Sequence, residues 1–464
     1  MKYLLFICLS LLNTNNLFSQ NQEHQLDSTY NKLYIEGAFN GNVLIADRGK
    51  IIFEKSYGLA NEQTREKLNS KSIFELASVS KQFTAAAIFL LKKKGSLSLE
   101  DPLQKYIPEL SFYREITIRN LLTHSSGLPD YMKLMDEKWD HLKIASNEDV
   151  ISLMAKYQPA VLFAANSKFE YSNTGYVLLA TIIERVSHQS YPRFMKENIF
   201  IPFGLKNTEV ISRYQLKRPF KNLTVGYLED SLGRKITPQT DRNLSLAFYL
   251  DGIYGPGRIF STAQDLFKWD RILATDKFVS AADKLLIYAP QILNDGKKSE
   301  YGFGWKLDSE NKLFGNFVYH DGGWGGYINF FERHLVNDKT IIILQNNFTK
   351  KTRTNLKNVR KIIYHLPIEN RIALDTAIMQ KYTGSYKDAD AKATNIVFEK
   401  GKLYVQMNAK VKMELVPLSG NRFIVDGFSP DVIYEFKDDA SGAVKKLRVL
   451  QRETGIDSES IKVK

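Results

Sequence analysis

A serine and a lysine three residues apart open an otherwise apolar segment of the chain. In "FELASVSKQFTAAAIFLLKKKG", residues 74–95, Ser78 and Lys81 precede a helical pattern of apolar residues. Residues three apart share a helix face, so the Ser78 hydroxyl and the Lys81 amine can meet, whereas Ser80 points elsewhere. A lysine whose pKa is lowered by burial and by nearby cations can take the proton of a serine hydroxyl. The pair therefore predicts a nucleophile with its base; a helix cap beside a solvent-exposed lysine is the alternative.

A second motif offers a proton carrier and an amide. "FEYSNTGYVLLATIIERV" places Tyr171 and Asn173 just before a helical pattern over residues 173–187. A tyrosine can relay a proton when cations lower its pKa, and an asparagine side chain can hold a substrate amide. The alternative is a packed tyrosine beside an asparagine that caps the helix.

A third motif combines a histidine with glycines. "VYHDGGWGGYINFF" puts His320 at the end of a predicted strand over residues 316–320, and Gly322 and Gly323 follow it. Glycines at this place let a substrate backbone lie close against a strand. The alternative is a glycine-rich hairpin turn beside a histidine without a role. The seven histidines show no metal-ligand spacing, so we expect neither a metal site nor a cofactor.

The three motifs, in this order, resemble those of the class C β-lactamase and penicillin-binding serine hydrolases: Ser78-Val79-Ser80-Lys81, Tyr171-Ser172-Asn173 and His320-Asp321-Gly322. Three further segments are similar to flanking segments of that family: residues 117–128, 254–266 and 301–305. The resemblance extends over about residues 30–365, and three ordered motifs are far more specific than any one of them.

The resemblance implies a role for each matched residue. Ser78 would be the acylated nucleophile, and Lys81 and Tyr171 would share its proton and return it to the leaving group. Asn173 would hold the substrate amide. The backbone N–H groups of Ser78 and Gly323 would form the oxyanion hole, in which one donor typically contributes about 10² to 10³ in rate.

The third motif departs from the lactamase form, which has lysine and threonine where this chain has His320 and Asp321. A lysine can pair with a substrate carboxylate, whereas a histidine is mostly neutral near pH 7, with an ordinary pKa of about 6.5. Asp321 adds a negative charge. These changes argue against penicillins and free D-Ala-D-Ala termini as preferred substrates. The histidine form, here His320 with Gly322 and Gly323 as substrate-binding residues, resembles that of the family's aminopeptidases, esterases and peptidases.

The patterns of strands and helices around these motifs predict an α+β fold. A hairpin over residues 43–60 begins a sheet, strand patterns return over 301–307, 316–320, 326–333 and 339–346, and helical patterns cover 79–94, 117–124, 173–187 and 351–365. We expect an antiparallel sheet flanked by helices with a largely helical inserted subdomain, β-lactamase/transpeptidase-like, over residues 25–368. Three further pairs of β-rich runs predict a small antiparallel, β-barrel-like domain over residues 376–464.

The first residues of the chain and its charge bear on the compartment. Residues 1–20 have one lysine and a short apolar run, which is typical of a signal peptide, so we expect export to the periplasm or the extracellular space. Because the cleavage signal before Gln20 is weak, an uncleaved membrane anchor is the alternative. The only cysteine, Cys8, lies in this segment, so after cleavage the mature chain would have no disulfide and no stable membrane span. The net charge of +13 comes from dispersed lysines, which do not indicate nucleic-acid binding.

Together these patterns predict an exported serine hydrolase of a peptide, amide or ester bond, of the D-amino-acid peptidase, aminopeptidase or esterase type. Its partner would be a small substrate, with the cell wall as one source. Within the same family the alternative is a β-lactamase or DD-carboxypeptidase. From another class, the alternative is a non-catalytic envelope binding protein. The sequence leaves the acyl donor and the oligomeric state open.

Overall fold

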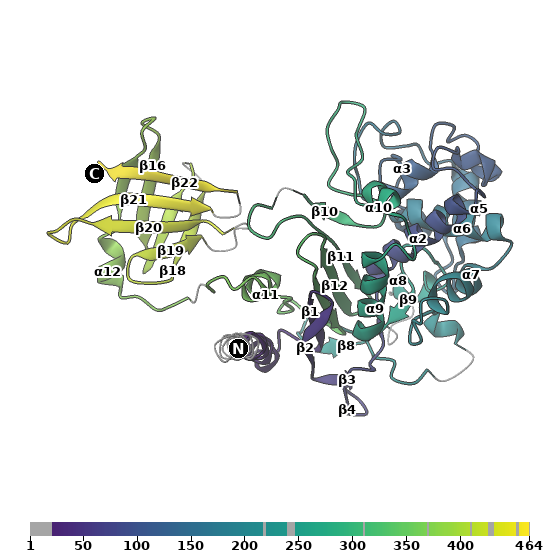
Figure 1. The fold of residues 1–464 in the computed structure, drawn as a ribbon, viewed down its shortest axis with the longest axis horizontal. Coiled ribbons are helices and arrows are strands. Elements are labelled where there is room, and N and C mark those ends of the chain that lie inside the picture. Colours follow the sequence, from purple (N-terminus) through teal and green to yellow (C-terminus); the bar gives the residue numbers. More distant parts are fainter. Residues whose placement is uncertain are drawn as a thin grey trace, which may run out of the picture. The chain divides into compact units, whose positions relative to one another are not determined.

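The computed structural model describes residues 21–216, 220–238, 246–309, 311–368, 371–408, 411–425, 431–451 and 454–463. The predicted signal peptide and Cys8 lie outside these residues. The chain forms two compact units (Figure 1). The first comprises Met1–Asp308 and Asn316–Leu356, and the second comprises Ser309–Gly315 and Lys357–Lys464.

The first unit is built on a six-stranded antiparallel sheet with the strand order β10-β11-β12-β13-β1-β2. Its strands are β1 (Gly41–Asp47), β2 (Lys50–Tyr57), β10 (Lys306–Asp308), β11 (Phe317–Trp324), β12 (Tyr327–His334) and β13 (Lys339–Gln345). The apolar runs of β1 and β13 are almost wholly buried, as expected for strands in the interior of a sheet. This sheet and the helices around it confirm the predicted α+β fold class.

Shorter strands complete the β structure of this unit. Three small sheets have the orders β5-β9-β6, β14-β7-β8 and β3-β4. Their strands are β3 (Leu59–Asn61), β4 (Glu66–Lys67), β5 (Phe74–Glu75), β6 (Glu209–Val210), β7 (Tyr227–Glu229), β8 (Lys235–Ile236), β9 (Ile259–Ser261) and β14 (Asn347–Phe348).

Helices surround the sheet and fill the middle of the unit. A helix over residues 21–35 comes first. It is followed by α2 (Lys81–Lys93), α3 (Ile118–Leu122), α4 (Tyr131–Lys138), α5 (Asn147–Tyr157), α6 (Asn173–Ser187), α7 (Tyr191–Met195), α8 (Leu246–Tyr249), α9 (Ala263–Ala274) and α10 (Ala281–Ile287). Short 3-10 turns are η1 (Ala77–Ser80), η2 (Leu103–Lys105), η3 (Pro108–Leu110) and η5 (Arg213–Gln215), and η4 (Lys196–Phe200) is a π-helical turn.

The two helices that follow the first two motifs pack against each other in the core. α2 is rich in alanine and leucine and ends before Gly95, whose φ of +72° suits the residue after a helix. It contacts α6, and Phe83 on α2 stacks on Trp269 of α9 with ring centroids 4.9 Å apart. α9 in turn contacts β1 and β13, so helix packing ties both motifs to the sheet.

Several boundaries differ from the sequence-based expectation. The strand predicted over residues 301–307 is β10, which begins only at Lys306, and the helix predicted over 351–365 is shorter, at Leu356–Ile363. The helix predicted from residue 79 begins at Lys81, because the residues before it form the tighter turn η1. His320 was expected at a strand end, but it lies inside β11 together with Gly322 and Gly323. The hairpin turn falls later, at Gly325 and Gly326, whose positive φ angles of 55° and 90° provide the reversal.

The second unit is a closed barrel of antiparallel strands from β15 to β22. The strands are β15 (Gly384–Lys387), β16 (Ala393–Glu399), β17 (Lys402–Gln406), β18 (Lys412–Pro417), β19 (Arg422–Val425), β20 (Ile433–Asp438), β21 (Val444–Gln451) and β22 (Ile456–Lys462). Its core includes Tyr382, Phe423 and Phe436. α11 (Leu356–Ile363) leads into this unit, and α12 (Thr376–Gln380) precedes β15.

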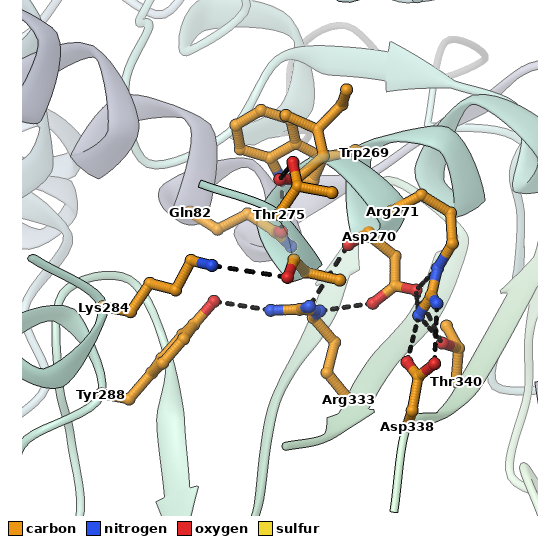
Figure 2. Close-up of polar contacts among 12 residues, drawn as sticks. Gln82, Trp269, Asp270, Arg271, Thr275, Lys284, Tyr288, Arg333, Asp338 and Thr340 are labelled. Atoms are coloured by element: carbon orange, nitrogen blue, oxygen red, sulfur yellow. Dashed lines mark hydrogen bonds and ion pairs between the residues drawn. The ribbon is translucent and has the colours of Figure 1, made fainter. Parts of the chain in front are cut away.

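A buried ion network joins α9 to the sheet of the first unit (Figure 2). Asp270 is 1% exposed and pairs with Arg271 of its own helix and with Arg333 of β12. It also accepts a hydrogen bond of 2.8 Å from Thr340 of β13, and Arg333 donates to the Tyr288 hydroxyl at 2.6 Å. Each charge in the network therefore has several polar partners.

The substitution Asp270→Asn is expected to destabilise the first unit by about 3–5 kcal/mol, because it leaves the buried guanidinium of Arg333 without its counter-charge, whereas Arg271 keeps its pair with Asp338. Denaturant unfolding measures this free energy. The control is Asp295→Asn in the exposed pair of Asp295 and Lys297, for which we expect a loss below about 1 kcal/mol. Equal effects of the two substitutions would contradict the structural role of the network.

Candidate active site

The serine of the first motif lies on a tight turn that is held from two sides. Ser78 is half-buried in η1 and follows Ala77, whose φ of +49° is unusual for a residue with a side chain. Ser80 is buried, and its hydroxyl accepts a hydrogen bond of 3.2 Å from the backbone N–H of Ile259. Ser80 thus fixes the turn to β9, and Ser78 is left as the serine that lines a cavity.

Lys81 is fully buried and makes three hydrogen bonds. Its ammonium nitrogen lies 3.0 Å from Ser78 Oγ, 2.9 Å from Asn173 Oδ1 and 3.0 Å from the carbonyl oxygen of Pro256. Burial lowers the pKa of Lys81 to about 7, against the opposing effects of Asp130 and Asp321. A neutral Lys81 amine is therefore accessible near neutral pH, within reach of the Ser78 proton.

This pKa sets the expected pH dependence of any reaction that uses Lys81 as a base. Below about pH 7 the amine is protonated and cannot accept a proton, so kcat/KM should fall about tenfold for each further pH unit. Hydrolysis of an uncharged ester measured between pH 5 and 9 tests this. A rate that stays flat down to pH 5 would contradict a base with this pKa.

Tyr171 lies beside the amine of Lys81. The Lys81 nitrogen is 4.9 Å from the centroid of the Tyr171 ring, and the tyrosine hydroxyl is buried without a hydrogen-bond partner of standard geometry in the described chain. Burial raises the pKa of Tyr171 above its usual value, and the nearby Ser78 hydroxyl offsets this only in part. The condition named for a proton relay, a tyrosine pKa lowered by cations, is therefore not met in this structure. Tyr171 is a neutral phenol that carries its proton.

Asn173 is held by a carboxylate that the motifs did not reveal. Asn173 is the first residue of α6, and its backbone N–H and its side-chain amide donate to Asp130 Oδ2 at 3.1 and 3.0 Å. Asp130 also caps α4 by accepting from the N–H of Met132 at 3.0 Å. These bonds fix the amide so that its oxygen faces Lys81. An aspartate before a helical pattern indicates a helix cap, so the capping role of Asp130 could be predicted from the sequence. Its contact with Asn173 could not.

His320 lies near these groups but beneath the surface. It is 1% exposed, its ring centroid is 6.2 Å from that of Tyr171, and its Nε2 is 2.9 Å from the Tyr301 hydroxyl. Burial, and then the charge of Lys81, lower the pKa of His320, so its imidazole is neutral. His320 does not line the cavity, so its contact with substrate stays a prediction.

Asp321 faces the opposite side of β11 and pairs with Lys306 of β10. Burial alone would raise its pKa, but the hydrogen bond from Lys306 and the charge of that lysine keep the pKa of Asp321 below its usual value. The negative charge that Asp321 brings to the third motif is therefore balanced by a cation on the adjacent strand.

The two glycines of β11 differ in their surroundings. A Cβ on Gly322 would lie 2.3 Å from the carbonyl oxygen of Leu76 and 3.0 Å from the backbone nitrogen of Ser78. The strand thus packs directly on the turn that carries Ser78. Gly323 lines the cavity together with Ser78, where the two N–H groups of the predicted oxyanion hole would lie.

The cavity in front of Ser78 has a volume of about 250 Å³ and a mainly apolar wall. Besides Ser78, Asn173 and Gly323, the wall includes Tyr131, Met132, Leu250, Ile253 and Trp324. Such a cavity suits a compact acyl group with an apolar side chain.

One part of the cavity wall is charged, through Glu75 and Arg258, and no motif in the sequence had pointed to this pair. Arg258 Nη1 lies 2.9 Å from Glu75 Oε1 and 3.1 Å from Asp251 Oδ1, and its guanidinium is 5.6 Å from the centroid of the Trp324 ring. Arg258 has a φ of +70° and is buried, so it is held rigidly. In the described part of the chain, no three His, Cys, Asp or Glu side chains gather as metal ligands would.

Comparison with known proteins gives the same picture. A family model described as Beta-lactamase matches residues 26–363. "Penicillin-binding protein 4*" of Bacillus subtilis (strain 168) is 36% identical over 96% of this chain and 100% of its own length. The fold is shared with the octameric penicillin-binding protein homologue from Pyrococcus abyssi, with a TM-score of 0.64 and 22% identity over 95% of this chain and 99% of that one. It is also shared with the D-amino acid amidase from Ochrobactrum anthropi SV3, with a TM-score of 0.59 and 22% identity over 75% of this chain and 96% of that one.

Proposed function

Because this chain belongs to the beta-lactamase family of serine hydrolases, we propose that it cleaves a peptide, amide or ester bond through an acyl-enzyme on Ser78. Family membership also confirms the resemblance drawn from the three motifs. One observation carries the proposal: a buried Lys81 amine with a pKa of about 7 lies 3.0 Å from the hydroxyl of Ser78, at the wall of a cavity.

The reaction proceeds in two halves. Neutral Lys81 takes the Ser78 proton as Oγ attacks the substrate carbonyl, and the N–H groups of Ser78 and Gly323 stabilise the oxyanion. Tyr171 donates its proton to the leaving amine or alcohol as the scissile bond breaks, and protonated Lys81 passes the proton taken from Ser78 to the phenolate. Water then attacks the acyl-enzyme while Lys81 takes one of its protons, and this proton passes to Ser78 Oγ as the acyl C–O bond breaks, which releases the acid and the free serine.

The substrate that we propose has a compact, apolar acyl group. The apolar side chains around Ser78 favour such a group, and Asn173, fixed by Asp130, offers its amide to the substrate. In the third motif the lysine expected for a carboxylate-binding lactamase site is replaced by the buried, neutral His320. Amides and esters without a free carboxylate are therefore the first candidates.

We also propose that the protein is exported, since residues 1–20 have the composition of a signal peptide. No helix in the described ranges is long and apolar enough to cross a membrane. Expression of the full chain in a bacterial host, followed by mass spectrometry of the mature N-terminus, tests this proposal. A chain that keeps its first twenty residues would contradict it.

Intact-protein mass spectrometry after treatment with a fluorophosphonate tests the proposed nucleophile. We expect one adduct on the wild type and none on the Ser78→Ala variant, whose backbone N–H groups are unchanged. Ser80→Ala is the matched control, and it should still be labelled because Ser78 remains. Turnover of p-nitrophenyl esters and D-amino-acid amides should likewise be lost in Ser78→Ala. A Ser78→Ala variant with unchanged turnover would indicate a binding protein instead.

Acylation by β-lactams is the second candidate, favoured by the 36% identity to a protein named as penicillin-binding. Fluorescent penicillin labelling and nitrocefin hydrolysis separate the two candidates. We expect ester or amide turnover to exceed nitrocefin turnover. The reverse order would make β-lactams the preferred class.

A further inference from the structure

A buried histidine outside the three motifs contacts three consecutive residues around Tyr171. We propose that His124 is a positioning residue that holds the phenol of Tyr171 in place for proton transfer to the leaving group. This inference rests on the proposed function of Ser78, and it assigns a role to a side chain that the two-step reaction above does not use.

His124 makes hydrogen bonds to the backbone on both sides of Tyr171 in the second motif. Its carbonyl oxygen accepts the N–H of Glu170 at 2.9 Å, and its Nδ1 accepts the N–H of Ser172 at 3.2 Å. Between these two bonds, the imidazole packs on the Tyr171 ring with centroids 4.3 Å apart. The peptide groups on both sides of Tyr171 and its ring are thus all fixed by one residue.

His124 is itself rigidly placed. It is 1% exposed and follows α3 and Thr123 with a φ of +55°, so its backbone turns sharply toward the second motif. Its ring also packs against Tyr301 and Tyr176 at 4.5 and 5.2 Å. Tyr301 in turn bonds His320, so the ring of Tyr171 lies in a cluster that includes the third motif.

The protonation of His124 suits a positioning role. Since Nδ1 accepts a hydrogen bond from a backbone N–H, the neutral ring carries its proton on Nε2, which is buried without a hydrogen-bond partner among the described residues. Burial, and then the nearby Lys81, hold the pKa of His124 well below its usual value. The imidazole therefore stays uncharged over the working pH range and acts through Tyr171.

Two substitutions separate the contacts of this side chain. His124→Phe keeps an aromatic ring against Tyr171 but removes the acceptor for the Ser172 N–H. His124→Asn removes the ring, but its Oδ1 can replace Nδ1 as acceptor, and asparagine tolerates a positive φ. With a D-amino-acid amide, whose nitrogen must be protonated before it can leave, we expect His124→Phe to lower kcat about 10²-fold with KM within about threefold of wild type, and His124→Asn to retain kcat within about fivefold. Loss in both variants alike would overturn the role of the Ser172 bond.

A double-mutant cycle with Tyr171→Phe tests whether His124 acts through the phenol. If it does, His124→Phe adds less than about a twofold loss to Tyr171→Phe, because the group that it positions is already absent. A general structural role would add its full loss in both backgrounds and would overturn the inference. Thermal unfolding of each variant shows whether the chain is folded. If His124→Phe does not fold, His124→Asn tests the inference by itself, and a kcat below about one fifth of the wild-type value in this folded variant would overturn it.

The same assay distinguishes failure of this inference from failure of the proposed function. Equal amide turnover by wild type and Ser78→Ala would overturn the proposed function and this inference with it. Turnover that depends on Ser78 but is insensitive to His124→Phe would overturn the inference alone.

Discussion

Replacing Lys81 by methionine is expected to lower Ser78-dependent ester turnover by about 10³-fold. The methionine side chain fits an apolar, buried site, but it cannot take the Ser78 proton, and general-base catalysis typically contributes 10² to 10⁴ in rate. Turnover is measured as the difference between each variant and its Ser78→Ala counterpart. The fluorophosphonate labelling rate should fall in parallel, because the same proton must leave Ser78 in that reaction.

The matched control for this change is Lys93→Met, at the exposed end of the same helix. Lys93→Met makes the same change in charge and in helix propensity as Lys81→Met, but Lys93 lies far from Ser78 along α2. We therefore expect turnover within about twofold of wild type. If Lys81→Met retained more than about a tenth of the turnover, another group would have to serve as the base. The proposed role of Lys81 would then be wrong.

The substitution Gly322→Ala is expected to lower turnover by about 10²-fold and to lower the unfolding temperature of the first unit. The added methyl group would lie 2.3 Å from the Leu76 carbonyl oxygen, so β11 and the turn with Ser78 must separate. Displacement of about 1 Å at a nucleophile or its oxyanion donors can cost 10²-fold in rate. Ester kinetics and thermal unfolding of the same preparation measure the two effects.

The neighbouring Gly323→Ala serves as control for the fold. A Cβ at this position would meet only Ile328 Cγ1, at 3.9 Å, so the unfolding temperature should stay close to that of the wild type. A larger drop in Gly323→Ala than in Gly322→Ala would contradict the close packing of the strand on the turn. Because Gly323 lines the cavity, its variant is compared by stability and not by turnover.

The sequence predicted the parts of the site that local geometry determines. The three-residue spacing of Ser78 and Lys81 was enough to select Ser78 over Ser80, and the structure agrees, with 3.0 Å between amine and hydroxyl. The period of apolar residues predicted α6 with its first residue at Asn173. The prediction that the second and third motifs lie beside the first rested on the order of these motifs in a known family. No local pattern could have predicted it, because the motifs are far apart in the chain.

The features that the sequence did not predict depend on tertiary contacts. Asp130 and His124 act on residues more than forty positions away, so no local pattern identifies their partners. The pKa of Tyr171 is raised by burial, which only the packed structure defines. Arg258 appeared as one more basic residue in a glycine-containing segment, although it pairs with Glu75 at the cavity wall.

The closure of the second unit limits how that unit can recruit other molecules. Because β15 pairs with β22 as well as with β16, the described strands close into a ring, with a β15–β22 seam of two residue pairs. Closure reduces the hydrogen-bonding border that an open sheet would offer to an extended peptide or to a second copy of the chain, and leaves the part of β22 before the seam as the place for such pairing. Recognition elsewhere on this unit uses side chains and loops, which can change in evolution without disturbing the ring.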